Sequence, residues 1–376
     1  SPAHLVNNVL MGQGVTASNI TFSGNTNQLG YFSNGLAGAT NPLGLDSGIV
    51  LSSGNVNDIG GTGALSTSYN GPGDPDLLSI AQTIQPGITS SQDAAILEFD
   101  FVPQGDTVEF RFVFASEEYT TYINSVFNDI FAFYITGPNP AGGSYPNTNV
   151  ALIPGTNLPV SINSVNPGLE PVGTNTAGDT VCYNNYTSFY NGNVTGIAYD
   201  GSTNVLSASA ATVPCQTYHF KLVIADGSDQ AWDSGVFLKV GSFSSSAVVI
   251  GASSVLGSGF NEAVEGCVDG VFALEVDTPY SYPVMIGFDI SGTATNGVDY
   301  ILISDSVLVP AGDTIVDINI VVLADGIIEG TETVILTPYT ACGTLGYPSI
   351  LEIVDDYPHT ISASVDTLCA PNNIQL

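Results

Sequence analysis

The chain has almost no basic residues. It contains only Arg111, Lys221 and Lys239 against 35 Asp and Glu residues, which gives a formal net charge of −32. Three cations cannot form the basic surface that holds a nucleic acid backbone, so we exclude nucleic-acid binding. The same scarcity argues against docking of the protein on anionic lipid through its own charge.

Long apolar runs are missing as well. The sequence has no stretch of about 18 apolar residues, so we expect no transmembrane helix and no direct insertion into a membrane. It also shows no sustained 3.6-residue periodicity, and the one short helix that we predict covers 76–82. Hydrophobic residues nevertheless make up 44% of the chain, which excludes a disordered acidic tail and indicates a folded protein with a sizeable core.

The remaining pattern is typical of an all-β protein, and we predict tandem β-sandwich domains. Gly (42) and Pro (21) are frequent and separate short segments in which apolar and polar residues alternate. The segment 130–135 is apolar on both faces, which predicts an interior strand. Segment 137–180 is predicted to be mostly loop. The main strand candidates are 48–54, 94–103, 107–116, 129–137, 217–226, 235–243, 271–276, 284–290, 314–325 and 332–339.

Changes in the pattern divide the chain into three parts. Residues 1–245 form the first domain, the Ser-rich stretch SSSAVV near residue 246 predicts a linker, and 246–358 form the second domain. Residues 359–376 restart an alternating pattern and are predicted to be the first strand of a further, truncated β domain. The opening SPAHLVNNVL is typical of a mature start after a removed signal peptide. We therefore expect the N-terminal part of a longer, secreted multidomain chain.

Five cysteines fit an oxidising compartment. We predict one disulfide between Cys182 and Cys215 and another between Cys267 and Cys342, each within one domain. Cys369 is left over, and we expect its partner to lie beyond the end of this sequence. Thiolate metal sites are the alternative, but no CxxC spacing supports them.

Acidic residues gather at predicted strand ends in the first domain, with no basic residue in the same loops. If the strands pair, their carboxylates converge, and a buried carboxylate cluster is costly without a cation. The candidate ligands for Ca²⁺ are Glu117, Glu118, Asn128, Asp129, Asp226, Asp229 and Asp233.

Two other interpretations of these residues stay open. Glu117, Asp129 and Asp226 could cap backbone N–H groups in tight turns. Alternatively, Glu117 or Glu118 could act as acid and Asp233 as base in a carboxylate-based hydrolase. No His or Lys lies nearby to adjust such a pair, and we expect that the protein is not an enzyme.

The second domain has its own acidic loop, ADGIIEGTETVILTP, at 324–338. Together with GTATNGVDY at 292–300 and the strand between them, this order resembles the Calx-β domain. The resemblance implies an immunoglobulin-like sandwich that binds Ca²⁺ at one end. The positions that it implies as ligands are Glu265, Asp299, Asp325, Glu329, Glu332, Asp355 and Asp356. The acidic loop carries fewer acidic residues than that of strongly binding members. A degenerate loop whose carboxylates are merely solvated is therefore the alternative.

Two long motifs in the first domain resemble the choice-of-anchor L domain. They are FVFASEEYTTYINSVFNDIFAFYITGP at 112–138 and IADGSDQAWDSGVFLKVGSF at 224–243. The resemblance implies a module of large surface proteins, many from Bacteroidota. In such a host it further implies type IX secretion and a relation to gliding-motility or biofilm adhesins.

We therefore expect a calcium-stabilised adhesion or display module, secreted and held at the extracellular cell surface. The expected partners are a glycan or an extracellular protein ligand, and the secretion machinery during export. A purely structural stalk is the main alternative.

Overall fold

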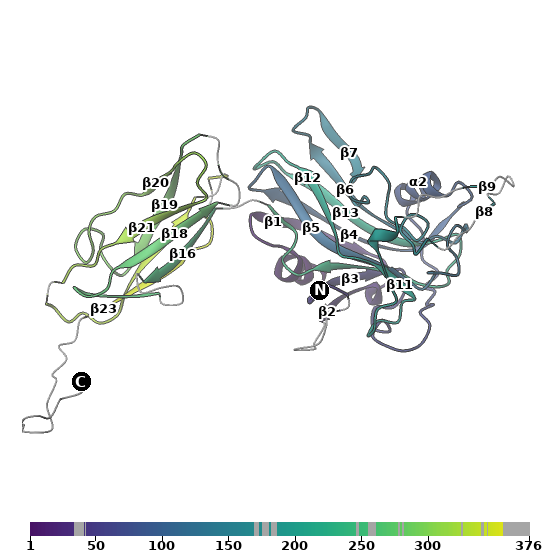
Figure 1. Ribbon diagram of the computed structural model, residues 1–376, viewed down its shortest axis with the longest axis horizontal. Coiled ribbons are helices and arrows are strands. Elements are labelled where there is room, and N and C mark those ends of the chain that lie inside the picture. The colour runs from purple at the N-terminus through teal and green to yellow at the C-terminus, as the bar shows by residue number, and fades with distance from the viewer. Residues whose placement is uncertain are drawn as a thin grey trace, which may run out of the picture. The chain divides into compact units, whose positions relative to one another are not determined.

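The structure, a computed structural model, describes residues 1–33, 41, 43–168, 173–174, 180–181, 186–245, 248–254, 261–276, 279, 282–324, 326–339, 342–343 and 345–355. Strands dominate these residues and form several sheets, which confirms the predicted all-β class (Figure 1). The chain divides into two compact units, one of residues 1–247 with 340–343 and one of residues 248–339 with 344–376. The predicted further strand at 359–376 lies outside the described residues.

The first unit contains two large antiparallel sheets. One sheet has five strands in the order β1-β4-β13-β6-β7, and the other has eight, along the path β10-β11-β5-β14-β3-β2 with β12 and β15 also paired to β5. The bounds of the first sheet are β1 (Val15–Ser23), β4 (Ser91–Pro103), β13 (Tyr218–Gly227), β6 (Ile130–Pro138) and β7 (Ser144–Asn149). Those of the second are β10 (Tyr190–Gly192), β11 (Gly201–Thr203), β5 (Thr107–Ser116), β14 (Ser234–Lys239), β3 (Ser47–Ser52), β2 (Leu29–Ser33), β12 (Leu206–Ala211) and β15 (Ser244–Ser245). A small two-stranded sheet joins β8 (Gly173–Thr174) and β9 (Thr180–Val181).

Phenylalanine rings join the two large sheets into a sandwich. The ring centre of Phe110 in β5 lies 4.8 Å from that of Phe133 in β6 and 5.4 Å from that of Phe220 in β13. All three rings are buried, and both contacts cross from one sheet to the other. Edge-to-face pairs of this kind contribute about 0.5–1.5 kcal/mol beyond the burial of their area. The alternation of β5 is therefore what places its aromatic residues in the core.

The second half of β5 is buried on both faces. Val113 and Ala115 point away from the main core, yet they are buried because loops that carry Leu43, Ile59 and Leu65 cover this outer face of the sheet. Burial on both faces continues to the end of the strand, where the acidic residues follow.

Helix α2 (Pro75–Ile84) covers the outer face of the other sheet and lies close to the predicted 76–82. The carboxylate of Asp74 caps it by accepting a hydrogen bond of 2.9 Å from the backbone N–H of Leu77. The buried residues Leu77 and Ala81 pack on β6 and β13. Since the opposite face of β6 belongs to the main core, this strand is buried on both sides, as predicted for 130–135.

The loop prediction for 137–180 is wrong in part. The segment forms β7, and after it an irregular stretch inserts Ile153, Val160 and Ile162 into the main core. These residues show no regular period, which is why periodicity could not separate this buried segment from an exposed loop. The other helices of the first unit are α1 (Pro2–Leu5), the π-helix η1 (Val6–Leu10), η2 (Thr26–Gln28) and η3 (Thr187–Phe189).

The second unit has two smaller sheets around one core. One has three strands, β16 (Val248–Ser254), β18 (Gly270–Val276) and β21 (Ile315–Ile320). The other has five, in the order β17 (Glu262–Val264), β23 (Ser349–Val354), β22 (Glu332–Pro338), β19 (Val284–Gly292) and β20 (Ser306–Val309). Phe272 and Leu274 of β18 meet Val334 and Leu336 of β22 in the core.

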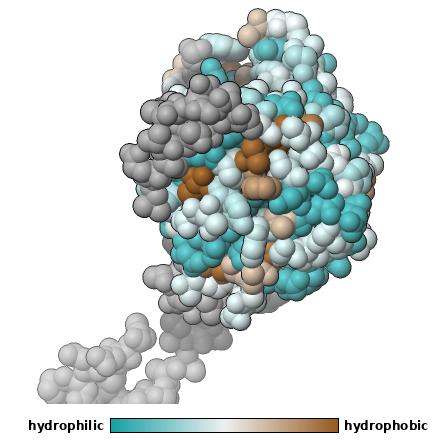
Figure 2. Space-filling view, turned by 90° about the vertical axis from the view of Figure 1, so that its right-hand side faces the viewer, coloured by the Kyte–Doolittle hydropathy of each residue, from teal (hydrophilic) through white to brown (hydrophobic). Residues whose placement is uncertain are grey.

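Figure 2 shows one face of the first unit, on which hydrophilic and near-neutral side chains dominate and hydrophobic ones form small, separate patches. In the described part of the chain, no helix combines the length and the apolar character that crossing a membrane requires.

Candidate functional site

Two antiparallel strands bring Asp129 and Asp226 together at one end of the first sandwich. β13 and β6 pair Ala225 with Ile130, so Asp226 at the end of one strand lies next to Asp129, just before the other. The two loops are joined directly, because the backbone N–H of Gly227 donates a hydrogen bond of 2.9 Å to Oδ1 of Asp129.

The second sheet adds Glu117, Glu118 and Asp233 at the same end. β5 and β14 pair Ser116 with Ser234, which puts the two glutamates after β5 beside Asp233 before β14. The N–H of Glu117 donates to the carbonyl of Asp233 at 3.1 Å. Oε2 of Glu118 accepts a bond of 2.9 Å from the N–H of Asp129, which links the two sheets. Strand pairing thus builds the cluster, and we name these five acidic residues the end cluster.

The end cluster contains buried oxygens without partners. Glu118, Asp129 and Asp226 are at most 1% exposed. A buried polar atom without a hydrogen bond is rare in proteins and costs about 1–3 kcal/mol, more if it is charged. The atoms concerned are Oε2 of Glu117, Oε1 of Glu118, Oδ2 of Asp129, both carboxylate oxygens of Asp226 and the hydroxyl of Ser234.

Burial raises the pKa of every member of the end cluster. It raises the pKa of Glu118, Asp129 and Asp226 well above the usual range, and the charge of Asp129 raises the pKa of the other two further. Burial likewise raises the pKa of Glu117, and it raises that of Asp233 to about 6. The nearby hydroxyl of Ser53 lowers the pKa of Asp226, and that of Ser234 lowers the pKa of Asp129. Neither hydroxyl is placed so that it forms a hydrogen bond with its carboxylate. The ionised forms of these carboxyl groups are therefore strongly disfavoured in the folded protein.

The other two predicted ligands of this domain lie at the edge of the end cluster. Asn128 is buried, but its side-chain oxygen accepts the N–H of Asn163 at 3.2 Å, and its amide nitrogen has no partner. Asp229 is half-buried and accepts the N–H of Ala231 at 3.1 Å. Its charge still reaches the buried glutamate and aspartate, whose pKa it raises.

No basic side chain neutralises the end cluster among the residues that the structure describes. The ion pairs among the described residues lie outside the end cluster and join His219 to Glu98 and Asp100, and Lys221 to Asp74 and Asp76. Carboxylate and hydroxyl oxygens are the hard ligands that suit Ca²⁺, which takes about six to eight of them. The donor chemistry therefore fits a hard cation.

A close group of three carboxylates lies in the second unit. In the described ranges, the one trio of His, Cys, Asp or Glu side chains whose ligand atoms all lie within 4.8 Å of one another is Asp299, Glu329 and Glu332. The end cluster contains no such trio, so a cation held there by its side chains would need the Ser hydroxyls or backbone oxygens as further ligands. Of the trio, Asp299 is buried, whereas Glu329 is exposed.

Five of the seven sequence-predicted ligands of the second unit lie close to one another. Burial raises the pKa of Glu332, and the nearby charges of Asp299, Glu329, Glu265 and Asp355 raise it further. Both carboxylate oxygens of Asp355 are engaged, since they accept the N–H groups of Glu329 and Gly330 at 3.1 and 2.9 Å. These five side chains, Glu265, Asp299, Glu329, Glu332 and Asp355, form what we call the second cluster.

Two further ligand predictions, Asp325 and Asp356, lie outside the described residues. The carboxylate of Asp299 accepts the N–H of Thr295 at 2.5 Å. As in the end cluster, backbone donors therefore satisfy part of the acidic groups, and a ligand role for the second cluster stays a prediction.

The predicted disulfide pairing is wrong. Cys215 pairs with Cys342, which lies in the segment 340–343 that belongs to the first unit, and Cys267 is a free, exposed thiol. Cys182 lies outside the described residues. The prediction failed because it assumed that each cysteine pairs within its own stretch of sequence, and connectivity cannot be read from spacing alone.

Sequence reasoning missed Asp93, a buried residue at the start of β4. Its carboxylate accepts the N–H groups of Tyr69 and Gly71, the former at 2.9 Å, and its charge raises the pKa of Asp226 and Asp233. The available signal was a polar residue directly before the apolar run of a strand. Positive backbone φ angles also gather nearby, 50° at Asp93 among them, as is common at functional sites.

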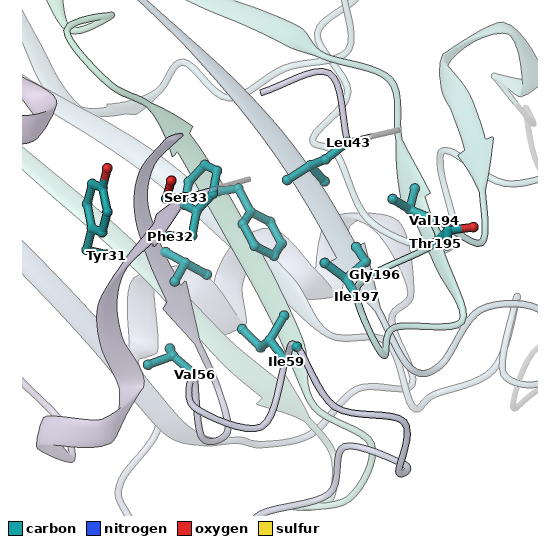
Figure 3. A pocket seen from close by; sticks show the side chains of 13 residues that line it. Tyr31, Phe32, Ser33, Leu43, Val56, Ile59, Val194, Thr195, Gly196 and Ile197 are labelled. Atoms are coloured by element: carbon teal, nitrogen blue, oxygen red, sulfur yellow. The ribbon is translucent and has the colours of Figure 1, made fainter. Parts of the chain in front are cut away.

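A cavity of about 280 Å³, with both apolar side chains and polar groups in its lining, lies elsewhere on the first unit, on the outer face of β2, β3 and β14. Figure 3 shows Phe32, Val56 and Ile59 on one part of its wall and Val194 and Ile197 on another. The cavity contains none of the predicted site residues.

Two solved structures that match this chain show little likeness to it. Two crystal structures of a GH2 beta-galacturonidase from Eisenbergiella tayi, bound to galacturonate and to glycerol, are 7% and 8% identical, each with a TM-score of 0.21. The alignments cover 90% of this chain and 43% of the enzyme, so the chain spans less than half the length of that protein. No curated protein matches the chain. The model of the choice-of-anchor L domain matches residues 1–244, which include the whole end cluster, and the chain therefore belongs to the choice-of-anchor L domain family.

Proposed function

We propose that this chain is a calcium-stabilised module for binding or display at the cell surface. Membership in the choice-of-anchor L family indicates a protein associated with the cell surface. The observation that supports calcium is the set of buried, unpartnered carboxylate oxygens in the end cluster, above all the two of Asp226.

If its carboxyl groups are ionised at neutral pH, the end cluster needs a positive partner. With Glu118, Asp129 and Asp226 ionised, three charges repel one another in a region of low dielectric, where a lone carboxylate already costs several kcal/mol. The alternatives are protonation of the carboxyl groups or a bound cation. A hard divalent cation such as Ca²⁺ would use the unpartnered oxygens, and this makes it the better explanation in calcium-rich extracellular medium.

We assign a second, weaker calcium site to the second cluster, in line with the resemblance to the Calx-β domain. The trio of Asp299, Glu329 and Glu332 supports this assignment through its close spacing. Because Glu329 is exposed, the site is open to water, and we expect an affinity of about 10⁻⁴–10⁻³ M, as in other extracellular modules.

The module would serve adhesion, with a glycan or an extracellular protein as ligand. The family supports this proposal, and the largely polar face of the first unit in Figure 2 is compatible with it. In a Bacteroidota host, export by type IX secretion and a role in gliding or biofilm formation would follow from the same resemblance. The buried position of Glu118 and Asp226 is out of reach of a polymeric substrate, which favours binding or support over hydrolysis.

Calorimetric titration of the whole chain with CaCl₂ tests the metal, and a glycan array read in calcium and in chelator tests the ligand. We expect two classes of calcium site, and array signals that vanish in chelator. Calcium binding and stiffening without any ligand signal would leave the structural stalk as the function. Absence of calcium binding would refute the proposal in its main point.

A further inference from the structure

Two members of the end cluster, Glu117 and Asp233, hold an extended segment that belongs to no sheet, Leu65–Gly71, which we name the strap. It runs between β3 and β4. Its residues alternate, since Leu65 is buried in the outer core whereas Ser66, Ser68 and Asn70 are exposed. The strap therefore lies on the protein as a strand would, with one side turned inward.

Carboxylates hold the strap in the place where a neighbouring strand would offer carbonyl groups. The N–H of Leu65 donates to Oε1 of Glu117 at 3.3 Å, and that of Thr67 donates to both oxygens of Asp233 at 2.9 and 3.0 Å. The N–H groups of Tyr69 and Gly71 follow with two bonds to Asp93. Every second amide of the strap thus ends on a carboxylate oxygen.

Backbone pairing contributes at the two ends of the strap. The N–H of Asp233 donates to the carbonyl of Leu65 at 2.9 Å, and that of Asp93 donates to the carbonyl of Gly71 at 3.2 Å. In the middle of the strap, the Ser68 hydroxyl also donates to Oε1 of Gln230 and the Ser66 hydroxyl accepts the N–H of Trp232. Hydrogen bonds to charged acceptors are stronger than neutral ones, so the anchoring carboxylates contribute the larger part of this attachment.

The anchoring carboxylates are coupled to the unpartnered ones beneath them. The charges of Asp233 and Asp93 raise the pKa of Asp226, and that of Asp233 also raises the pKa of Asp129. The position of Asp233 is tightly defined, since a Cβ on Gly54 would come within 1.8 Å of its Oδ2. If Asp129 and Asp226 are ionised and lack a cation, their repulsion with Asp233 and Asp93 falls when these two anchoring carboxylates move toward water. The strap, which is bonded to the anchors, then detaches from the protein surface.

We infer that the strap is a lid over the end cluster, and that a cation beneath it determines whether it is docked. This inference rests on the proposed calcium site. It also gives the route of the ion, because Glu118, Asp129 and Asp226 are at most 1% exposed and a cation reaches them only when a covering segment opens. Among the segments at this end of the sandwich, the strap is held by carboxylates of the end cluster itself, Glu117 and Asp233.

Amide hydrogen exchange of the whole chain, followed by mass spectrometry in millimolar calcium and in excess chelator, tests this inference. Peptides that contain Leu65–Gly71 should exchange about tenfold faster or more in chelator, whereas peptides from β4 and β13 should change less. An Asp226→Asn variant removes an inner charge without touching the strap, so its strap should stay protected in chelator. The exposed Asp106→Asn variant is the matched control and should behave as the unchanged protein.

A Gly54→Ala variant displaces the Asp233 carboxylate while keeping its charge, and its strap should exchange fast even in calcium. Should this variant fail to fold, the comparison of Asp226→Asn with Asp106→Asn still decides the matter. Equal strap exchange with and without calcium, in a protein that binds calcium by calorimetry, would overturn the lid and leave the proposed site standing. No calcium binding at all would overturn both.

Discussion

Replacing Asp226 by asparagine separates the charge of the end cluster from its shape. The two side chains have the same size, and both carboxylate oxygens of Asp226 lack hydrogen-bond partners, so the substitution breaks no bond that the structure contains. The residue is 0% exposed, so solvent does not screen its charge and cannot make the effect of the substitution small. What changes is one negative charge in a buried group of acids.

The expected effect has opposite signs with and without calcium. Calcium at a hundred times its dissociation constant adds about 2.7 kcal/mol to the native state through mass action. For a unit of the size of residues 1–247, this corresponds to roughly 5–11 °C in Tm. Asp226→Asn should lose most of this gain. In chelator at neutral pH, the variant should be at least as stable as the unchanged protein, because a buried charge or a forced protonation has been removed.

Differential scanning calorimetry of the whole chain measures both signs, with Asp106→Asn as the control on an exposed carboxylate. The Tm values of Asp226→Asn in calcium and in chelator should be nearly equal. The control should keep the higher Tm in calcium that the unchanged protein shows. If Asp226→Asn lowers Tm equally in both media, the loss is one of packing. The argument from unpartnered charge is then wrong.

Further predictions concern proton linkage, the disulfide and the second cluster. Because burial raises the folded-state pKa of Asp233 to about 6 from 3.8, its stabilising contribution is complete below the unfolded value and is lost as pH rises through the folded one. In chelator, Tm should therefore fall between about pH 4 and pH 6, and calcium should remove this fall; a rise over that window would contradict the assignment. Peptide mapping without reduction should find Cys215 linked to Cys342 and Cys267 alkylated in the native protein, whereas a Cys267–Cys342 peptide would restore the pairing expected from the sequence. Glu332→Gln should abolish the weaker calcium isotherm and leave the tighter one, and loss of both would mean that the two clusters are not separate sites.

Much of the end cluster could be predicted from the sequence because it depends on strand ends. The alternation of β5 and the apolar run of β6 are visible as patterns, and both are confirmed as buried strands. Once these strands pair, the acidic residues that follow them must lie together. Asp129 and Asp226 meet for this reason, at a register that pairs Ala225 with Ile130.

The strap and its anchors could not be predicted in this way. Leu65–Gly71 has no periodicity that distinguishes it from other Ser-rich loops. Asp93 lies some twenty residues away, in a sequence that resembles the start of any other strand. Their contact depends on tertiary packing, since the strap meets carboxylates from three separate segments of the chain. The same limit explains the disulfide, whose partners are 127 residues apart and give no local signal.

The placement of the few cations gives the last reason to look outside the chain for the partner of the end cluster. Lys221 forms ion pairs beside α2, at 2.6 Å from Asp74 and 2.9 Å from Asp76. Arg111 and Lys239 line a hollow of about 250 Å³ together with Glu109, toward the middle and the far end of their strands. All three basic residues of the sequence are thus placed away from the strand ends that carry the buried acids. Since no basic side chain in the part of the chain that the structure describes pairs with these acids, we expect protons or metal ions from the medium to do so, and the pH and calcium experiments above distinguish the two.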